Sequence, residues 1–186
     1  MPIKHLAPAI IITFTLLAFI FPEWLTALEF NHQAIKQGEL WRLLTGHFYH
    51  TNDIHMVLNI GALILLWGLH HRYYSLQKYL ILFVLISLAT SIALLQFSDI
   101  LLYVGLSGVL HGMFIHGALS DINYGDKTGY LLLIGAIFKI GHEQVFGASS
   151  QVESLINANV AIDAHLYGAI AGLIIYFVKK QQMSKN

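Results

Sequence analysis

Apolar residues along this chain gather in long blocks that short polar segments separate. The blocks lie near residues 7–27, 53–69, 77–97, 104–120, 129–146 and 160–178. Each is about 17 to 22 residues long, enough for a helix to cross roughly 30 Å of hydrocarbon. The pattern predicts an all-α membrane protein, a bundle of six transmembrane helices that forms a single domain over residues 1–186.

The composition of the chain is typical of a membrane protein. Of 186 residues, 56% are hydrophobic and only 11% are charged, outside the usual range of soluble domains. The first block continues through Phe19 and Trp24 without a small-residue cleavage site, which favours a spanning helix over a secretion signal. No basic stripe indicates nucleic acid, and the absence of cysteine excludes disulfides, thiol catalysis and Cys metal sites.

The positive charges predict how the helices are oriented. With six spans both termini share one side, and seven of the ten Lys and Arg residues lie there: Lys4, Arg72, Lys78, Lys127, Lys179, Lys180 and Lys185. Lys36, Arg42 and Lys139 lie on the other side. Because cytoplasmic segments retain positive charge, we expect cytoplasmic termini and outward-facing loops at 28–52, 98–103 and 147–159.

Polar residues interrupt three of the predicted helices, each time near the outer end. The interruptions are His55 and Asn59 in the second block, Gly105, Ser107 and Gly108 in the fourth, and His165, Gly168 and Gly172 in the sixth. All lie within roughly two turns of the outer end of a helix, so they share one depth. Polar groups inside a bilayer are costly, and this shared depth indicates a functional site.

The spacing also predicts which side chains share a helix face. Residues four apart lie on the same side of a helix, as do Ser107 and His111, or Gly168 and Gly172. Small residues beside Ser107 and His165 allow their two helices to pack closely. We therefore expect the serine and the imidazole to come within hydrogen-bond distance.

A serine paired with a histidine suits acyl transfer. Ser107 is the candidate nucleophile and His165 the candidate general base. The tetrahedral oxyanion needs donors, which the Asn59 amide, the His55 ring and the Ser107 backbone N–H could supply. Asp163 precedes His165 by two residues and points elsewhere on a helix, so these residues predict a dyad with no third acid, no metal and no cofactor.

These motifs, in this order, resemble those of the rhomboid family. They are Trp41-Arg42 through His50, His55-x-x-x-Asn59, Gly-x-Ser107-Gly and Ala-His165-x-x-Gly168, and the resemblance covers about residues 38–177. It implies a six-helix intramembrane serine protease of the bacterial inner membrane, with an active site facing the periplasm. It also implies that Ser107 and His165 are catalytic and that His55 and Asn59 are oxyanion donors. Trp41 and Arg42 would support the first loop, residues 28–52.

One departure from the family pattern narrows the resemblance. His111 stands where many rhomboids have a tyrosine that packs against the catalytic histidine, and it could take over that contact. With the run Gly105 to Gly112, this makes the chain most similar to the rhombosortase branch. That branch implies membrane-anchored substrates with a C-terminal Gly-Gly motif, a hydrophobic helix and a basic tail.

Other interpretations fit parts of the pattern. Glycines in membrane helices often serve packing alone, single histidines often lie at the interface, and Trp41 and Arg42 could be an interfacial anchor. A rhomboid-like protein could also bind client helices without cutting them. The histidines could instead carry haem or a metal, but a haem site needs two histidines near mid-membrane, and the paired His70 and His71 lie at the expected cytoplasmic end. No His-Glu-x-x-His or Gly-x-Ser-x-Gly motif favours a metalloprotease or a soluble hydrolase.

Overall fold

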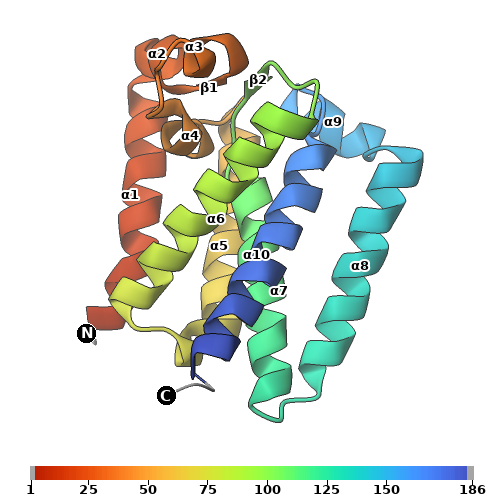
Figure 1. The fold of residues 1–186 in the computed structure, drawn as a ribbon. Helices are drawn as coiled ribbons and strands as arrows, with labels where there is room; N and C mark the ends of the chain where they lie inside the picture. The colour runs from red at the N-terminus through yellow and green to blue at the C-terminus, as the bar shows by residue number, and fades with distance from the viewer. Residues whose placement is uncertain (1–2, 184–186) are drawn as a thin grey trace.

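The computed structural model describes residues 3–183, most of them in a bundle of long helices (Figure 1). The long helices are α1 (Leu6–Ile20), α5 (Asp53–His70), α6 (Leu76–Phe97), α7 (Ser107–Asn123), α8 (Thr128–Phe146) and α10 (Ile162–Met183). Each begins within three residues of the start predicted from the hydrophobic blocks. The prediction of an all-α architecture is therefore confirmed for the part of the chain that the structure describes.

The first helix is shorter than predicted. We expected it to continue to residue 27, but α1 ends at Ile20. Phe21 leaves the helical conformation with φ −115° and ψ 65°, because the ring of the following Pro22 disfavours helical geometry at the preceding residue. The chain continues through a 3₁₀ turn, Pro22–Trp24, and α2 (Leu25–Leu28).

Short elements cover one end of the bundle and the chain termini lie at the other (Figure 1). The short elements at the covered end are β1 (Phe30–Asn31), α3 (His32–Lys36), α4 (Arg42–Thr45), β2 (Leu102–Tyr103) and α9 (Ser150–Ile156). β1 and β2 pair antiparallel, with Phe30 opposite Tyr103. The three loops predicted to lie on one side therefore share one end, and Lys185 of the charge count lies outside the described residues.

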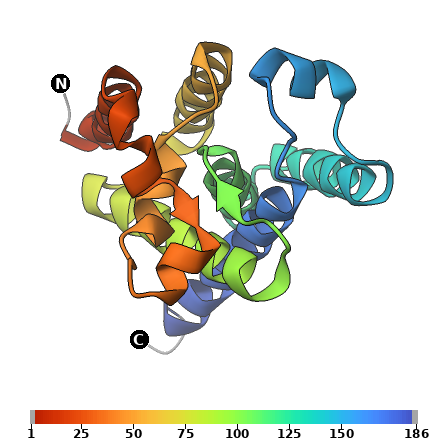
Figure 2. The same cartoon turned by 90° about the horizontal axis from the view of Figure 1, so that it is seen from above.

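Four of the described helices are long and apolar enough to cross a membrane alone. They are Ile3–Ile20, Asp53–Tyr73, Leu76–Phe97 and Ile162–Gln182. α8 passes the same test only together with α9, from which it is bent by 89°. α7 has 17 residues, many of them buried, and it lies among the other helices when the bundle is viewed from above (Figure 2). A helix enclosed in this way needs no apolar surface toward lipid.

α7 and α10 touch through their glycines. A Cβ added to Gly168 would overlap the Gly108 carbonyl oxygen, and one added to Gly172 would overlap that of Gly112. The two predicted glycine stripes thus face each other, backbone against backbone. Such close contact between membrane helices requires small residues on both sides. It also fixes the relative position of Ser107 and His165, which lie at the N-terminal ends of these helices.

Gly168→Val should therefore disrupt the bundle. The added side chain cannot fit against Gly108, so α7 and α10 must separate, at an expected cost of about 3 kcal/mol or more. The measurement is the thermal unfolding midpoint of the purified protein in detergent. Gly68→Ala is the matched control, since no atom lies within 4 Å of its added Cβ. Equal midpoints for the two variants would contradict the packing argument.

Candidate active site

Ser107 and His165 meet at the N-terminal ends of α7 and α10. Ser107 is the first residue of α7, and His165 lies in the first turn of α10. The distance from Ser107 Oγ to His165 Nε2 is 3.0 Å, and His165 is 5% exposed. The sequence predicts that these two residues lie at one depth on helices that can pack closely. The structure brings them to hydrogen-bond distance.

A carboxylate that the sequence analysis missed lies on the other side of the imidazole. His165 Nδ1 donates to Glu143 Oε2 of α8 at 2.9 Å, and Lys139 Nζ lies 2.7 Å from Glu143 Oε1. The expectation that no third acid approaches His165 is therefore wrong. Asp163, the acid two residues before His165, is directed away from the imidazole as expected, since it accepts from Ser98 Oγ at 2.5 Å.

His111 packs flat against His165. The ring centroids are 4.1 Å apart with an interplanar angle of 22°, and His111 Nδ1 donates to the Ser107 carbonyl oxygen at 2.7 Å. The contact expected of His111 is confirmed. Ser107, His111 and His165 thus form one unit in which a backbone hydrogen bond holds the stacking ring.

The candidate oxyanion donors lie around the start of α7. The Ser107 N–H is in the first turn of α7, where an N–H has no intrahelical acceptor and the helix dipole favours negative charge. Asn59 is 5% exposed, and its Nδ2 donates one hydrogen to the His55 carbonyl oxygen at 2.9 Å. The amide has a second hydrogen available for another acceptor.

His55 is held by the loop that precedes α5. Its Nδ1 accepts from the Thr51 backbone N–H at 3.4 Å and lies 3.1 Å from Thr51 Oγ1. When Nδ1 accepts, a neutral imidazole carries its hydrogen on Nε2. The Nε2 edge faces Gly105, where an added Cβ would lie 3.0 Å from that nitrogen. His50 packs against the His55 ring edge to face, with centroids 4.8 Å apart.

Gly105 turns the chain into α7. Its φ of +122° is a conformation that residues with a Cβ rarely adopt, and a Cβ would also crowd the His55 ring. The Gly105 N–H donates to the Gly46 carbonyl oxygen, and its own carbonyl accepts from Tyr103 Oη at 2.6 Å. Glycine at this position therefore lets the first loop, β2 and the start of α7 meet.

An apolar groove leads sideways from Ser107. It has a volume of about 490 Å³ and lies between α5 and α8, with α7 as its floor. Its polar wall consists of Asn59, Ser107, His111 and Lys139. The rest is apolar, formed by residues such as Leu65, Phe114 and Leu131. An extended apolar segment that lies in this groove can place a backbone carbonyl beside Ser107.

Trp41 and Arg42 fasten the first loop rather than approach Ser107. Arg42 Nη1 donates to the carbonyl oxygens of Thr26 and Glu29, each at 2.9 Å, and Trp41 Nε1 donates to that of Ala27 at 3.0 Å. Arg42 is 6% exposed. These contacts agree with the structural role that the family resemblance implies.

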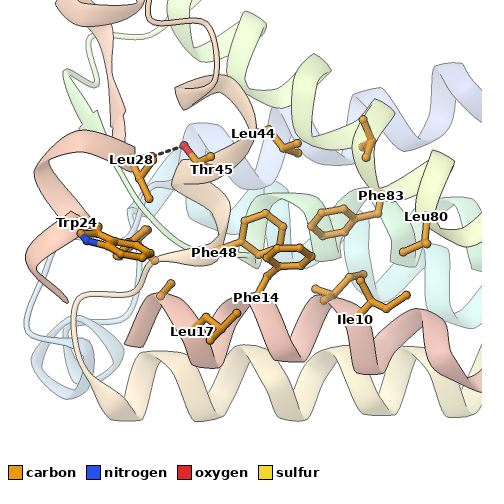
Figure 3. Close-up of a pocket in the computed structure, with 14 residues that line it drawn as sticks. Ile10, Phe14, Leu17, Trp24, Leu28, Leu44, Thr45, Phe48, Leu80 and Phe83 are labelled. Carbon is orange, nitrogen blue, oxygen red and sulfur yellow. Dashed lines mark hydrogen bonds between the residues drawn. The ribbon is translucent and has the colours of Figure 1, made fainter. Parts of the chain in front are cut away.

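A second apolar cavity lies on the far side of this loop (Figure 3). Its volume is about 530 Å³, and its lining comes from α1, the first loop and α6, including Phe14, Phe48 and Phe83. Thr45 Oγ1 donates to the Leu28 carbonyl oxygen at its rim, at 2.5 Å. Among the described residues, Tyr49 is the one titratable side chain in its lining.

His111, Glu143 and His165 are also the one set of described residues whose donor atoms could reach a common metal ion, since these atoms lie within 4.8 Å of one another. A metal binds imidazole nitrogens in the ring plane, from directions that converge. The two rings here are stacked, and both nitrogens of His165 already have partners. The geometry fits a hydrogen-bonded network better than a metal site.

His70 and His71, the paired histidines of the sequence, are engaged at the opposite end of the bundle. His70 Nε2 lies 3.2 Å from Asp121 Oδ2, and His71 Nδ1 donates to the Trp67 carbonyl oxygen at 3.2 Å. Arg72 and Tyr73 bind the other oxygen of Asp121, at 2.8 and 2.6 Å. The Asp121 contacts tie the end of α5 and the following turn to α7, whereas His71 bonds back to its own helix.

A family model described as Rhomboid domain matches residues 37–182, nearly the range over which the motifs were recognised. No curated protein matches the chain.

Acid should destabilise the first loop through its buried histidines. Burial lowers the pKa of His47 to about 4, and burial together with the neighbouring His55 lowers the pKa of His50 to about 3. In the unfolded chain both have pKa values near 6.5, so the unfolded state binds more protons below that pH. Stability is therefore complete above about pH 6.5 and falls as the pH drops toward 4.

The measurement is the thermal unfolding midpoint in detergent between pH 8 and pH 4. His47→Gln should flatten its acid slope, because glutamine can replace the hydrogen bond to the Ser87 carbonyl oxygen without titrating. His142→Gln, at an exposed position on α8, is the control and should leave the slope as in the wild type. An unchanged slope in His47→Gln would show that acid acts elsewhere.

Proposed function

Because the chain belongs to the rhomboid family, whose members are in general intramembrane serine proteases, we propose that it hydrolyses peptide bonds of membrane-anchored proteins. Ser107 is the nucleophile and His165 the general base in this proposal. The observation that carries it is the 3.0 Å contact between Ser107 Oγ and His165 Nε2, at the wall of an apolar groove.

The reaction uses the pair in two steps. His165 takes the proton of Ser107 Oγ as the oxygen attacks the scissile carbonyl carbon, and the imidazolium then returns that proton to the leaving amine. The C–N bond breaks and leaves an acyl ester on Ser107. Water, deprotonated by the same imidazole, attacks the ester, and the regenerated serine releases the carboxylate product.

The oxyanion of each tetrahedral intermediate lies at the start of α7 in this proposal. The Ser107 N–H supports this role, as do the free hydrogen of the Asn59 amide and the His55 Nε2. Donors that are already in place cost no reorganisation when charge develops, which is why such groups accelerate acyl transfer.

The substrate enters through the groove between α5 and α8. A helical substrate hides its carbonyls in its own hydrogen bonds, so the segment near Ser107 must unwind before attack. The apolar walls fit the flanking residues of a membrane anchor, while Lys139 and Asn59 mark the polar end where water can arrive. Water is needed only for the second step.

The membrane arrangement is part of the same proposal. All six long helices span the bacterial inner membrane, both termini are cytoplasmic, and the end that carries Ser107 faces the periplasm. The charge asymmetry supports this orientation, with seven of ten Lys and Arg residues on the side of the termini. The proposed substrates carry a Gly-Gly motif before a C-terminal hydrophobic helix and a basic tail, because His111 suggests the rhombosortase branch.

Reporter cleavage in proteoliposomes tests the function. Wild type should cut a reporter with a Gly-Gly motif, a hydrophobic helix and a basic tail, whereas Ser107→Ala and His165→Ala should lose at least about 10³-fold in rate. Ser120→Ala, which removes a buried hydroxyl at the far end of α7, is the matched control and should retain activity. If wild type cuts only other membrane anchors, the protease activity is supported and the Gly-Gly substrate class is excluded.

A client-binding protein without catalysis would give a different result. It would bind these anchors and leave them intact, and a serine-directed fluorophosphonate would fail to label Ser107. Labelling of wild type and not of Ser107→Ala would exclude this alternative.

The oxyanion assignment predicts a selective loss of turnover. Asn59→Ala and His55→Ala should each lower kcat by about 10²- to 10³-fold and leave KM nearly unchanged, since the lost hydrogen bond forms only in the transition state. Initial rates over a range of reporter concentrations measure both constants. A rise in KM at constant kcat would instead show that these residues bind the substrate.

A further inference from the structure

Two charged residues lie one turn apart on α8, near the end of the bundle that carries Ser107. Lys139 is half exposed, whereas the side chain of Glu143 is only 13% exposed. A carboxylate inside a membrane helix is costly unless it is paired, and such residues commonly serve function. Glu143 has a partner for each of its oxygens, Lys139 on Oε1 and His165 on Oε2.

The hydrogen bonds of Glu143, His165 and Ser107 form a continuous line. Glu143 Oε2 is 2.9 Å from His165 Nδ1, and His165 Nε2 is 3.0 Å from Ser107 Oγ. Three helices, α8, α10 and α7, each contribute one member. The His165 ring is 7% exposed, so water does not compete freely for either nitrogen.

The carboxylate decides where the imidazole proton lies. An ionised carboxylate can only accept, so His165 Nδ1 must carry the hydrogen in this contact. Nε2 then has a free lone pair directed at the hydroxyl of Ser107, the tautomer that a general base requires. Without the carboxylate, the hydrogen could move to Nε2, and the ring could no longer accept from the serine.

Two other nearby groups do not accept the hydrogen on His165 Nδ1. Asp163 is engaged by Ser98, and His111 lies against the face of the His165 ring, where it meets neither nitrogen. The contact of Glu143 with Nδ1 is therefore the one that sets both the rotation of the ring and its tautomer. His111 restrains the ring only against tilting.

We propose that Glu143 is the positioning residue for His165, so that Ser107, His165 and Glu143 act as a triad rather than a dyad. This inference rests on the proposed function. Glu143 orients the base before attack, and its negative charge stabilises the imidazolium that forms when His165 has taken the serine proton. Lys139 holds the carboxylate in place through its second oxygen.

Three substitutions separate these contributions. Glu143→Ala removes orientation and charge together, whereas Glu143→Gln keeps an acceptor of nearly the same shape and removes the charge. Glu143→Asp keeps the charge on a side chain that is one methylene shorter. Asp163→Asn is the matched control, since it neutralises the acid closest to His165 in sequence, which makes no contact with the ring.

Two rates are measured for each purified variant in proteoliposomes: reporter cleavage, resolved into kcat and KM, and fluorophosphonate labelling of Ser107. We expect kcat to fall on the order of 10²- to 10⁴-fold in Glu143→Ala and Glu143→Gln with KM within about threefold. Labelling should slow in parallel. Glu143→Asp should recover part of the rate, and Asp163→Asn should match wild type.

The outcomes distinguish this inference from the proposed function. If wild type cleaves and labels, while Glu143→Gln keeps both rates within about threefold and its unfolding midpoint unchanged, Glu143 is not a positioning residue and the dyad stands. If every Glu143 variant, Glu143→Asp included, loses rate only in proportion to a lowered unfolding midpoint, Glu143 has a structural role and the inference is overturned. If wild type itself neither cleaves nor labels, the proposed function fails and the triad with it.

Discussion

The contact between α7 and α10 is the constraint on which the rest of the site depends. Gly108 and Gly112 of one helix face Gly168 and Gly172 of the other so closely that an added Cβ would overlap the opposite backbone. In a bilayer no hydrophobic effect draws helices together, so close van der Waals contact of this kind does much of that work. Since Ser107 and His165 lie at the ends of these two stripes, the packing that stabilises the bundle also sets the distance between them.

Two polar networks lie at the two ends of the bundle. At one end, Asp121 accepts from Arg72 and Tyr73 and meets His70, which joins α5 to α7. At the other end, Glu143 and His165 form a network with Lys139 and Ser107. An unpaired polar group in hydrocarbon would cost several kcal/mol, so each network is complete in itself. The middle of the bundle remains largely apolar.

The site combines rigid and accessible parts. His165, Glu143 and the stacked His111 belong to packed helices, and Gly105 holds the turn into α7 with its unusual φ. The groove between α5 and α8, in contrast, has apolar walls and opens beside Ser107. Such a division suits a protease of the membrane, which must hold its reacting groups in fixed geometry and yet admit a long chain from the side.

The sequence by itself determined the parts that local rules govern. Blocks of apolar residues placed the starts of the long helices, and residues spaced four apart predicted the glycine stripes. The position of Ser107 and His165 near the starts of their helices predicted their shared depth. The end of α1 was misplaced because hydrophobicity continues past Pro22, whereas helical geometry does not. Only the tertiary structure decided that Glu143 meets His165. The two residues belong to different helices that a loop and α9 separate, and Glu143 lies in no motif, so its contact with the ring depends on how α8 packs rather than on any spacing along the chain.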